Sequence, residues 1–403
     1  MNASAGRARR QLSLLSLAIV LGMSPWFAAT VVATPMADTL GLSPLLVSWL
    51  TLAVQLGFVF GSLGSAVLVL SDRLSPRRLA AGASFVAAGS TALLALVQTG
   101  AGAEAIGLRL LTGAALACVY PPGIKIAAGW TDRHRGTAIG ILVGAVTLGT
   151  ATPHLLRAAV DLGFWRPVLL AAAASAALGG VLFLVAVREG PYQAPSAPFD
   201  PGAVRRVLRD RGVRLATAGY LGHMWELYAM WSTVGLFLTA AASRHGVAPV
   251  WAPIIAFAAI GVGAIGSVVA GIRADRVGRV RVAIAAMAVS GTCAVLVGPT
   301  FRVSFPLTVL VTLIWGVSVV ADSAQFSACV AELSPREYVG TAVTVQTAAG
   351  FLLTMLTIHL VPGWATRWGW EWAYLPLVAG PVFGIVAMQR LGPYRSPDGV
   401  SAA

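Results

Sequence analysis

The amino-acid sequence predicts an all-α polytopic membrane protein with twelve transmembrane helices, arranged as two homologous six-helix bundles. The first observation is composition: 57% of the 403 residues are hydrophobic and 11% are charged, whereas about 25% are charged in soluble proteins. The second is a succession of apolar stretches close to the roughly 20 residues that a helix needs to cross a bilayer. The third is an internal repeat that divides these stretches six and six. Together they exclude a soluble globular protein.

Twelve apolar stretches are predicted to be helices. They cover residues 12–34, 44–70, 79–99, 105–129, 137–157, 166–187, 214–240, 250–272, 280–300, 305–331, 339–361 and 371–391. The first stretch follows Arg7, Arg9 and Arg10, as the apolar core of a signal peptide would. It is longer than the about 7 to 15 residues of such a core, so we expect a retained first helix.

One connection is long and rich in proline and arginine, and it separates the first six helices from the last six. The predicted domains are an N-terminal bundle over 1–187, a cytoplasmic linker over 188–213 and a C-terminal bundle over 214–403. The second part of the linker carries four arginines. It is either an amphipathic helix lying on anionic lipid headgroups or a solvated segment.

The internal repeat consists of four pairs of matching positions, separated by 200 to 204 residues. The pairs are Leu21-Gly22 with Leu221-Gly222, Asp72-Arg73 with Asp275-Arg276, Gly113 with Gly316, and Gly136-Thr137-Ala138 with Gly340-Thr341-Ala342. Two repeats that meet around a midplane site are the architecture of secondary transporters, which open that site alternately to either side. The repeat therefore predicts this class of function as well as the fold.

The basic residues predict the orientation, because cytoplasmic loops carry an excess of lysine and arginine. With the N-terminus inside, 21 of the 28 basic residues lie on the inner side and five lie in outer loops. We therefore expect a multi-pass protein of the inner, cytoplasmic membrane of the cell with both termini in the cytoplasm.

Three local motifs carry a resemblance to a known family. Residues 271–281 read Gly-Ile-Arg-Ala-Asp-Arg-Val-Gly-Arg-Val-Arg, residues 72–78 form a weaker copy that lacks the glycines, and Arg109 opens the run Arg-Leu-Leu-Thr-Gly. With these motifs the whole chain resembles the major facilitator superfamily. The resemblance implies the twelve-helix fold of that family, a loop motif that gates it and an arginine that takes part in proton coupling.

The loop motifs supply a predicted conformational latch. Its residues are Asp72, Arg73, Asp275, Arg276 and Arg279. An aspartate at a helix end can accept hydrogen bonds from the N-terminal amides of a neighbouring helix, while the arginines pair with acids at the inner surface. Contacts that exist in one conformation only would stabilise the inward-closed state. Alternatively, these arginines only follow the general excess of basic residues in cytoplasmic loops.

Charged and polar side chains inside the predicted helices supply a candidate pathway for substrate and protons. Its residues are Glu226, His223, Arg109, Trp225, Trp231, Met230 and Asp322. Glu226 lies near the middle of the seventh predicted helix, and helical spacing puts His223 and Met230 on its face. Because removal from water disfavours a charged carboxylate, Glu226 is suited to bind and release a proton. The alternative is an acid fixed by a hydroxyl or backbone partner.

The other two charged residues have competing structural interpretations. Arg109 lies about one turn inside the outer end of the fourth predicted helix, where a cationic side chain can extend to the interface. That structural role competes with substrate or proton coupling. Asp322 either lines the cytoplasmic exit or braces the bundle, and we expect it to brace the bundle.

Several other functions find no support in the residues. The arginines are scattered among short loops, which argues against nucleic acid as a partner. The motifs of metalloproteases, serine hydrolases and nucleotide-binding loops are missing, so we expect no enzyme, no cofactor and no metal site. The expected partners are a small-molecule solute, protons and the lipid bilayer, with a monomeric protein. The alternative function is a solute-sensing receptor or a channel-like facilitator without proton coupling.

The topology leads to a first prediction. A reporter fused after Arg206 should be cytoplasmic, and one inserted within 241–249 should be external, as alkaline phosphatase and fluorescent protein fusions can measure. An external signal from the Arg206 fusion would overturn the orientation and the number of helices before it.

Overall fold

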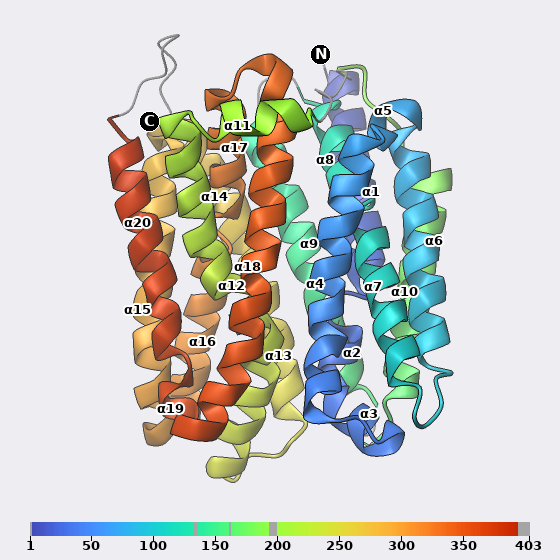
Figure 1. Cartoon of the computed structure of the whole chain (residues 1–403), viewed down its shortest axis with the longest axis vertical. Helices are drawn as coiled ribbons and strands as arrows, with labels where there is room; N and C mark the ends of the chain where they lie inside the picture. The colour runs from blue at the N-terminus through green and yellow to red at the C-terminus, as the bar shows by residue number, and fades with distance from the viewer. Residues whose placement is uncertain (1, 132–134, 161–162, 193–199, 394–403) are drawn as a thin grey trace. The chain divides into compact units, whose positions relative to one another are not determined.

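Figure 1 shows the computed structural model of the chain, which describes residues 2–131, 135–160, 163–192 and 200–393. Within these residues the chain consists of α-helices and short 3-10 helices joined by turns, and it contains no strand. Each of the twelve predicted stretches is helical over most of its length. The predicted all-α class is therefore confirmed.

The chain divides into two compact units, Met1–Ser65 with Leu70–Pro195, and Ala66–Val69 with Ser196–Ala403. The helices of the first are α1 (Asn2–Met23), α2 (Ala28–Val31), α3 (Ala33–Leu40), α4 (Pro44–Val67), α5 (Leu70–Arg73), α6 (Pro76–Leu94), α7 (Gly102–Leu116), α8 (Tyr120–Ala128), α9 (Arg135–Ala158) and α10 (Arg166–Val185). The predicted extent of the domains, with a linker over 188–213, remains a prediction.

The second unit is also built from helices alone in its described residues. They are η1 (Pro201–Ala203), α11 (Val204–Val207), α12 (Arg211–Arg244), α13 (Trp251–Gly261), α14 (Gly263–Val277), α15 (Arg279–Val303), α16 (Phe305–Val319), α17 (Ser323–Leu333), η2 (Arg336–Tyr338), α18 (Val339–Trp368), α19 (Trp370–Ala373), η3 (Leu375–Val378) and α20 (Ala379–Leu391).

Nine helical stretches of the described residues are long and apolar enough to cross a membrane. Three predicted helices fall outside this set, in the segments that contain α1, α6 and α12. α6 is rich in alanine, glycine and serine, and α12 carries histidine and glutamate within its length. Large apolar side chains such as Leu96, Ile265 and Val303 are more than half exposed, as suits surfaces that lie against lipid rather than water.

Two helices of the first unit that the sequence predicts as continuous are interrupted. The predicted helix 12–34 ends as α1 at Met23 and resumes as α2 at Ala28. Pro25 lies between them, and it has no amide hydrogen to donate to a helical carbonyl. The predicted helix 105–129 divides into α7 and α8, and two prolines occupy the start of α8, where proline is well tolerated.

The second unit contains a corresponding interruption without proline. α16 ends at Val319 and α17 begins at Ser323. Just before the break, the Ser318 hydroxyl lies within hydrogen-bond distance of the carbonyl oxygens of Ile314 and Trp315, at 3.0 and 3.1 Å. Serine bonding back to the preceding turn bends helices. The break leaves Asp322 at the start of α17.

Two glycines of the internal repeat make the same close contact in each unit. A Cβ atom at Gly113 of α7 would collide with the carbonyl oxygen of Val54 in α4. A Cβ atom at Gly316 of α16 would collide with the carbonyl oxygen of Ala259 in α13. Small residues let membrane helices approach backbone to backbone. The repeat therefore preserves one helix contact, which explains why glycine occupies both positions.

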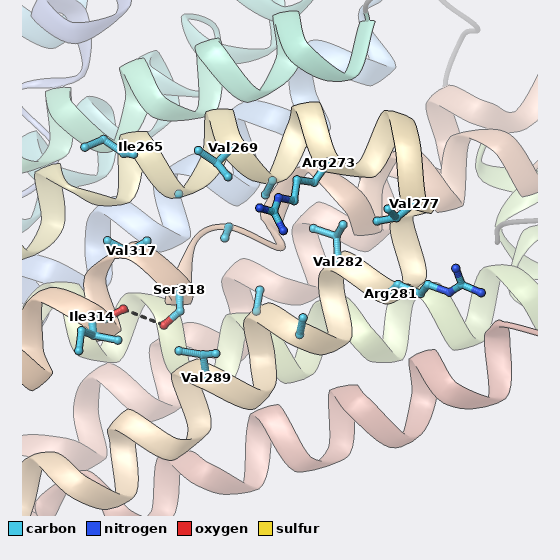
Figure 2. A pocket seen from close by; sticks show the side chains of 15 residues that line it. Ile265, Val269, Arg273, Val277, Arg281, Val282, Val289, Ile314, Val317 and Ser318 are labelled. Carbon is cyan, nitrogen blue, oxygen red and sulfur yellow. Dashed lines mark hydrogen bonds between the residues drawn. The ribbon is translucent and has the colours of Figure 1, made fainter.

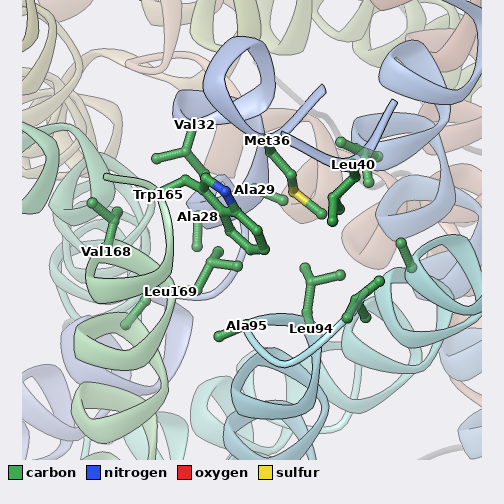
Figure 3. Packing of buried hydrophobic residues seen from close by; sticks show 14 residues of the cluster. Ala28, Ala29, Val32, Met36, Leu40, Leu94, Ala95, Trp165, Val168 and Leu169 are labelled. Carbon is green, nitrogen blue, oxygen red and sulfur yellow. The ribbon is translucent and has the colours of Figure 1, made fainter. Parts of the chain in front are cut away.

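A buried apolar cluster holds the short helices α2 and α3 to α6 and α10 in the first unit. Figure 3 shows the Trp165 indole among Val32, Met36 and Leu169. Its side chain is 2% exposed, and its indole nitrogen donates to the Thr39 hydroxyl at 3.2 Å. A large ring with one polar atom suits this position, because the ring packs while the nitrogen finds a partner.

The glycine contact leads to a second prediction. Gly113→Ala should lower the free energy of unfolding by about 1–3 kcal/mol, since overpacking forces two helices apart. Gly107→Ala is the matched control, because Gly107 lies in the same helix and no atom would contact its Cβ within 4 Å. Thermal unfolding of the two purified variants should show a loss for Gly113→Ala only. Equal midpoints would contradict the close contact.

Candidate functional site

Glu226 lies in α12 and is 2% exposed. Its two carboxylate oxygens each accept a hydrogen bond from a different helix. The Trp315 indole nitrogen of α16 donates to Oε1 at 2.6 Å, and the Ser290 hydroxyl of α15 donates to Oε2 at 2.9 Å. Hydrogen bonds to a charged acceptor are short and strong, so the pair of donors compensates the carboxylate for the loss of water.

His223 lies one helical turn before Glu226 and forms a second buried polar pair. Its Nδ1 is 2.8 Å from Oδ1 of Asp322, with side chains 1% and 2% exposed. The two atoms are within ion-pairing distance, but their orientation does not make a hydrogen bond. The ring packs beside Phe326, with centroids 5.5 Å apart. Asp322 thus brings the start of α17 into contact with α12.

The two pairs form one polar region in the second unit. Asp322 is close enough to Glu226 for the two carboxyl charges to interact. Nε2 of His223 is buried and has no hydrogen-bond partner among the described residues. A buried polar atom without a partner is costly, so this nitrogen leaves one hydrogen-bonding position of the region unfilled by the described residues.

The other predicted residues of α12 lie in different surroundings. Met230 is fully buried. The Trp225 indole nitrogen donates to the Pro376 carbonyl oxygen at 3.2 Å, so it fixes α12 against η3. Trp231 is 2% exposed, its ring meets the Tyr228 ring edge-on, and its nitrogen has no partner among the described residues.

Arg109 lies in α7 of the first unit and is fully buried. Its guanidinium donates to three carbonyl oxygens: Leu50 of α4 at 3.0 Å, Pro25 at 2.9 Å and Trp26. The alternative in which this side chain extends to the interface does not describe the structure, because the guanidinium instead bonds carbonyl groups at the interrupted first helix and in α4. A planar group with five donors can satisfy several of them at once.

The predicted latch residues are only partly brought together. Arg279 at the start of α15 donates to both carboxylate oxygens of Glu332 in α17, at 2.6 to 3.1 Å. Asp275 lies close enough to Arg279 for their charges to interact. Arg276 and Arg73 are exposed, and the Asp72 side chain lies outside the described residues.

Sequence reasoning missed Trp315, Ser290 and Glu332. A signal existed for the first, because Trp315 directly precedes Gly316 of the repeat and a buried carboxylate requires donors. It also missed Gln55 of α4 and Gln346 of α18, which are 0% and 1% exposed. Neither amide has a hydrogen-bond partner among the described residues. Each therefore offers an unused donor and acceptor within its own unit.

The described residues contain no group of three or more His, Cys, Asp or Glu side chains that could hold a metal ion. In the second unit the arrangement places a buried carboxylate with two hydrogen-bond donors beside a buried His–Asp pair.

Comparisons with known proteins agree on one family. A family model described as Major Facilitator Superfamily matches residues 14–352. An MFS-type transporter, pytF of Aspergillus terreus, is 30% identical over 173 residues, which are 42% of this chain and 56% of that protein. The alignment thus spans little more than half the length of this relative.

Solved structures with the same fold include two symporters. The structure of the proton:xylose symporter XylE bound to 6-bromo-6-deoxy-D-glucose has a TM-score of 0.74 and 14% identity, over 99% of this chain and 98% of that one. A D-xylose-proton symporter has a TM-score of 0.72 and 16% identity, over 97% and 98%. At these identities the likeness establishes the twelve-helix fold.

The contacts of Arg109 lead to a third prediction. Arg109→Gln should lower the free energy of unfolding by about 3 kcal/mol, because three buried carbonyl groups lose the charge-assisted hydrogen bonds of the guanidinium. Arg302→Gln is the control: this arginine is 55% exposed and pairs with Glu371, so its loss should cost at most about 1 kcal/mol. Denaturant unfolding measures both. A stable Arg109→Gln protein that no longer transports would move Arg109 to the pathway instead.

Proposed function

Because the chain belongs to the major facilitator superfamily, we propose that it is a secondary transporter, which moves a small solute by alternating access and couples that movement to protons. The observation that carries the proposal is Glu226, a buried acid with two defined donors. We further propose a monomer in the inner membrane of the cell, with both termini in the cytoplasm, as the distribution of basic residues predicts.

Ser290 gives Glu226 a way to change protonation without leaving a buried group unpaired. The Trp315 nitrogen can only donate, so the Oε1 that it contacts stays an acceptor and a proton must bind at Oε2. The Ser290 hydroxyl lies 2.9 Å from Oε2 and 3.2 Å from the Met287 carbonyl oxygen. When Oε2 is ionised, the hydroxyl donates to it. When Oε2 is protonated, the hydroxyl turns to Met287 and accepts from the acid.

His223 and Asp322 extend this proton site. Asp322 is close enough to Glu226 for the two carboxyl charges to interact. It also lies 2.8 Å from Nδ1 of His223, so three side chains that can carry protons follow one another. We propose that these residues carry protons between Glu226 and the aqueous side to which α17 leads.

The solute is proposed to be a neutral, polar organic molecule. Gln55 and Gln346 are buried amides without partners among the described residues. A side-chain amide has a donor and an acceptor, so it can pair with a hydroxyl group that accepts or donates. The glucose derivative named for the similar symporter structure is a ligand of this kind. The charged residues support the same class, because Arg109 is already bonded to three carbonyl groups.

Two other functions are separated by transport measurements. A solute-sensing receptor would bind its ligand and show no counterflow in proteoliposomes. A channel-like facilitator without proton coupling would equilibrate the solute but would not accumulate it. A thermal-shift screen of neutral sugars, amides and amines on the purified protein supplies the test solute, because a ligand that binds the native state raises its stability.

The proton site leads to a fourth prediction. Glu226→Gln keeps the shape of the side chain but cannot carry a proton, so it should lose accumulation driven by a pH gradient. Counterflow should persist, because exchange requires no net proton release. Glu371→Gln removes a carboxylate of the same unit that pairs with Arg302, and it should retain both activities.

Other outcomes have defined meanings. The affinity for solute measured by counterflow could instead fall about ten- to a hundredfold. In that case Glu226 contacts a cationic solute through a charge-assisted bond, and the neutral solute class is wrong. Full retention of both activities would remove Glu226 from the proton pathway.

A further inference from the structure

A groove of about 620 Å³ opens between α14, α15 and α16 on the second unit. Figure 2 shows its two ends. Ile265, Ile314 and Val317 lie at one end, and Arg273 and Arg281 lie toward the other, near the turn that joins α14 to α15. Between Ile265 and Arg273 the helix rises about 12 Å. The groove is thus apolar over most of its length and cationic at one end.

The charge at the cationic end is uncompensated. Arg273 and Arg281 are exposed, and neither forms an ion pair within the described part of the chain. All the other side chains that line the groove are apolar except Ser318, whose hydroxyl bonds to its own helix. The groove therefore attracts an anion and has no acid that would attract a cation.

The first unit carries a counterpart of this groove, of about 650 Å³, along α6 and α7. Ten lining positions of the two grooves match at a separation of 203 residues, the separation of the internal repeat. Arg78 corresponds to Arg281 in this way, and Arg73 supplies a second arginine to the counterpart. The two units thus share the same combination of an apolar groove and two basic side chains, although their sequences otherwise differ.

We propose that these two grooves are binding sites for anionic glycerophospholipids, one in each unit. An acyl chain would lie in the apolar part, and the phosphate would bind between the arginines, which hold phosphate groups well. The apolar lining is exposed, with Ile265 at 63% and Val289 at 45%, so in a bilayer lipid chains cover it. By the predicted topology the basic ends lie in the cytoplasmic leaflet, where anionic lipids attract basic segments.

The chemistry favours this occupant over two others. Free phosphate would leave the apolar part unfilled. A zwitterionic phosphatidylcholine would bring a positive ammonium group to a place with two arginines and no acidic lining residue. An anionic headgroup on an acyl chain matches both ends at once. The inference does not rest on the proposed transport function.

Native mass spectrometry of the full-length protein, delipidated in detergent, tests the proposal. Palmitoyl-oleoyl phosphatidylglycerol should bind with two lipids per chain at the highest affinity, and phosphatidylcholine with the same chains should bind more weakly. Arg273→Gln with Arg281→Gln should remove one tight lipid, weakening it about tenfold as expected for a lost charge-assisted bond. Arg73→Gln with Arg78→Gln should remove the other, and the fourfold variant both.

Two further variants keep the result interpretable. Arg214→Gln with Arg390→Gln removes two exposed arginines of the second unit outside its groove, and it should retain both tight lipids. Ala285→Phe fills the apolar part from an exposed position without changing charge, and it should also lose one lipid.

Three results would overturn the proposal. They are equal affinity for the two lipids, an equal loss in the Arg214 and Arg390 control, and displacement of phosphatidylglycerol by glycerol phosphate at similar concentration. The last would identify sites for free phosphate rather than for lipid.

Discussion

The guanidinium of Arg109 compensates for an interruption that lipid could not tolerate. Within a bilayer every backbone polar group must find a partner inside the protein, and the first helix is broken at Pro25. Arg109 donates to carbonyl oxygens at that break and to Leu50 of α4. The segment after the break then builds α2 and α3, which the Trp165 cluster holds against the rest of the unit. One side chain thus joins the interrupted first helix to α4.

The second unit shows what happens when that requirement is absent. At the repeat separation of 203 residues, the position of Arg109 is occupied by Thr312, which bonds to its own helix. Its first long helix, α12, is continuous over 34 residues, so it has no interruption for an arginine to bridge. The polar residues instead gather along α12, around Glu226 and His223. Two repeats with one fold have thus placed their buried charges for different purposes.

Composition and periodicity were sufficient to predict the helices, because apolar length is a local property of the sequence. The interruptions of the helices were harder to predict from the sequence. Pro25 signals one, but the break before Asp322 follows from serine bonding within α16. The residues of the candidate site that lie on α12 were predicted, since helical spacing places His223 and Glu226 on one face. Its partners were not, because Ser290 and Trp315 are 64 and 89 residues away from Glu226. Only packing brings them together.

That separation has a consequence for biosynthesis. α12 is not among the nine stretches of the described residues that are long and apolar enough to cross a membrane, and acidic residues oppose insertion of a single helix. Ser290 and Trp315, which compensate Glu226, leave the ribosome after α12 does. In the order of synthesis α12 therefore precedes both donors to its buried carboxylate, and Glu226 has these partners only after α15 and α16 have followed.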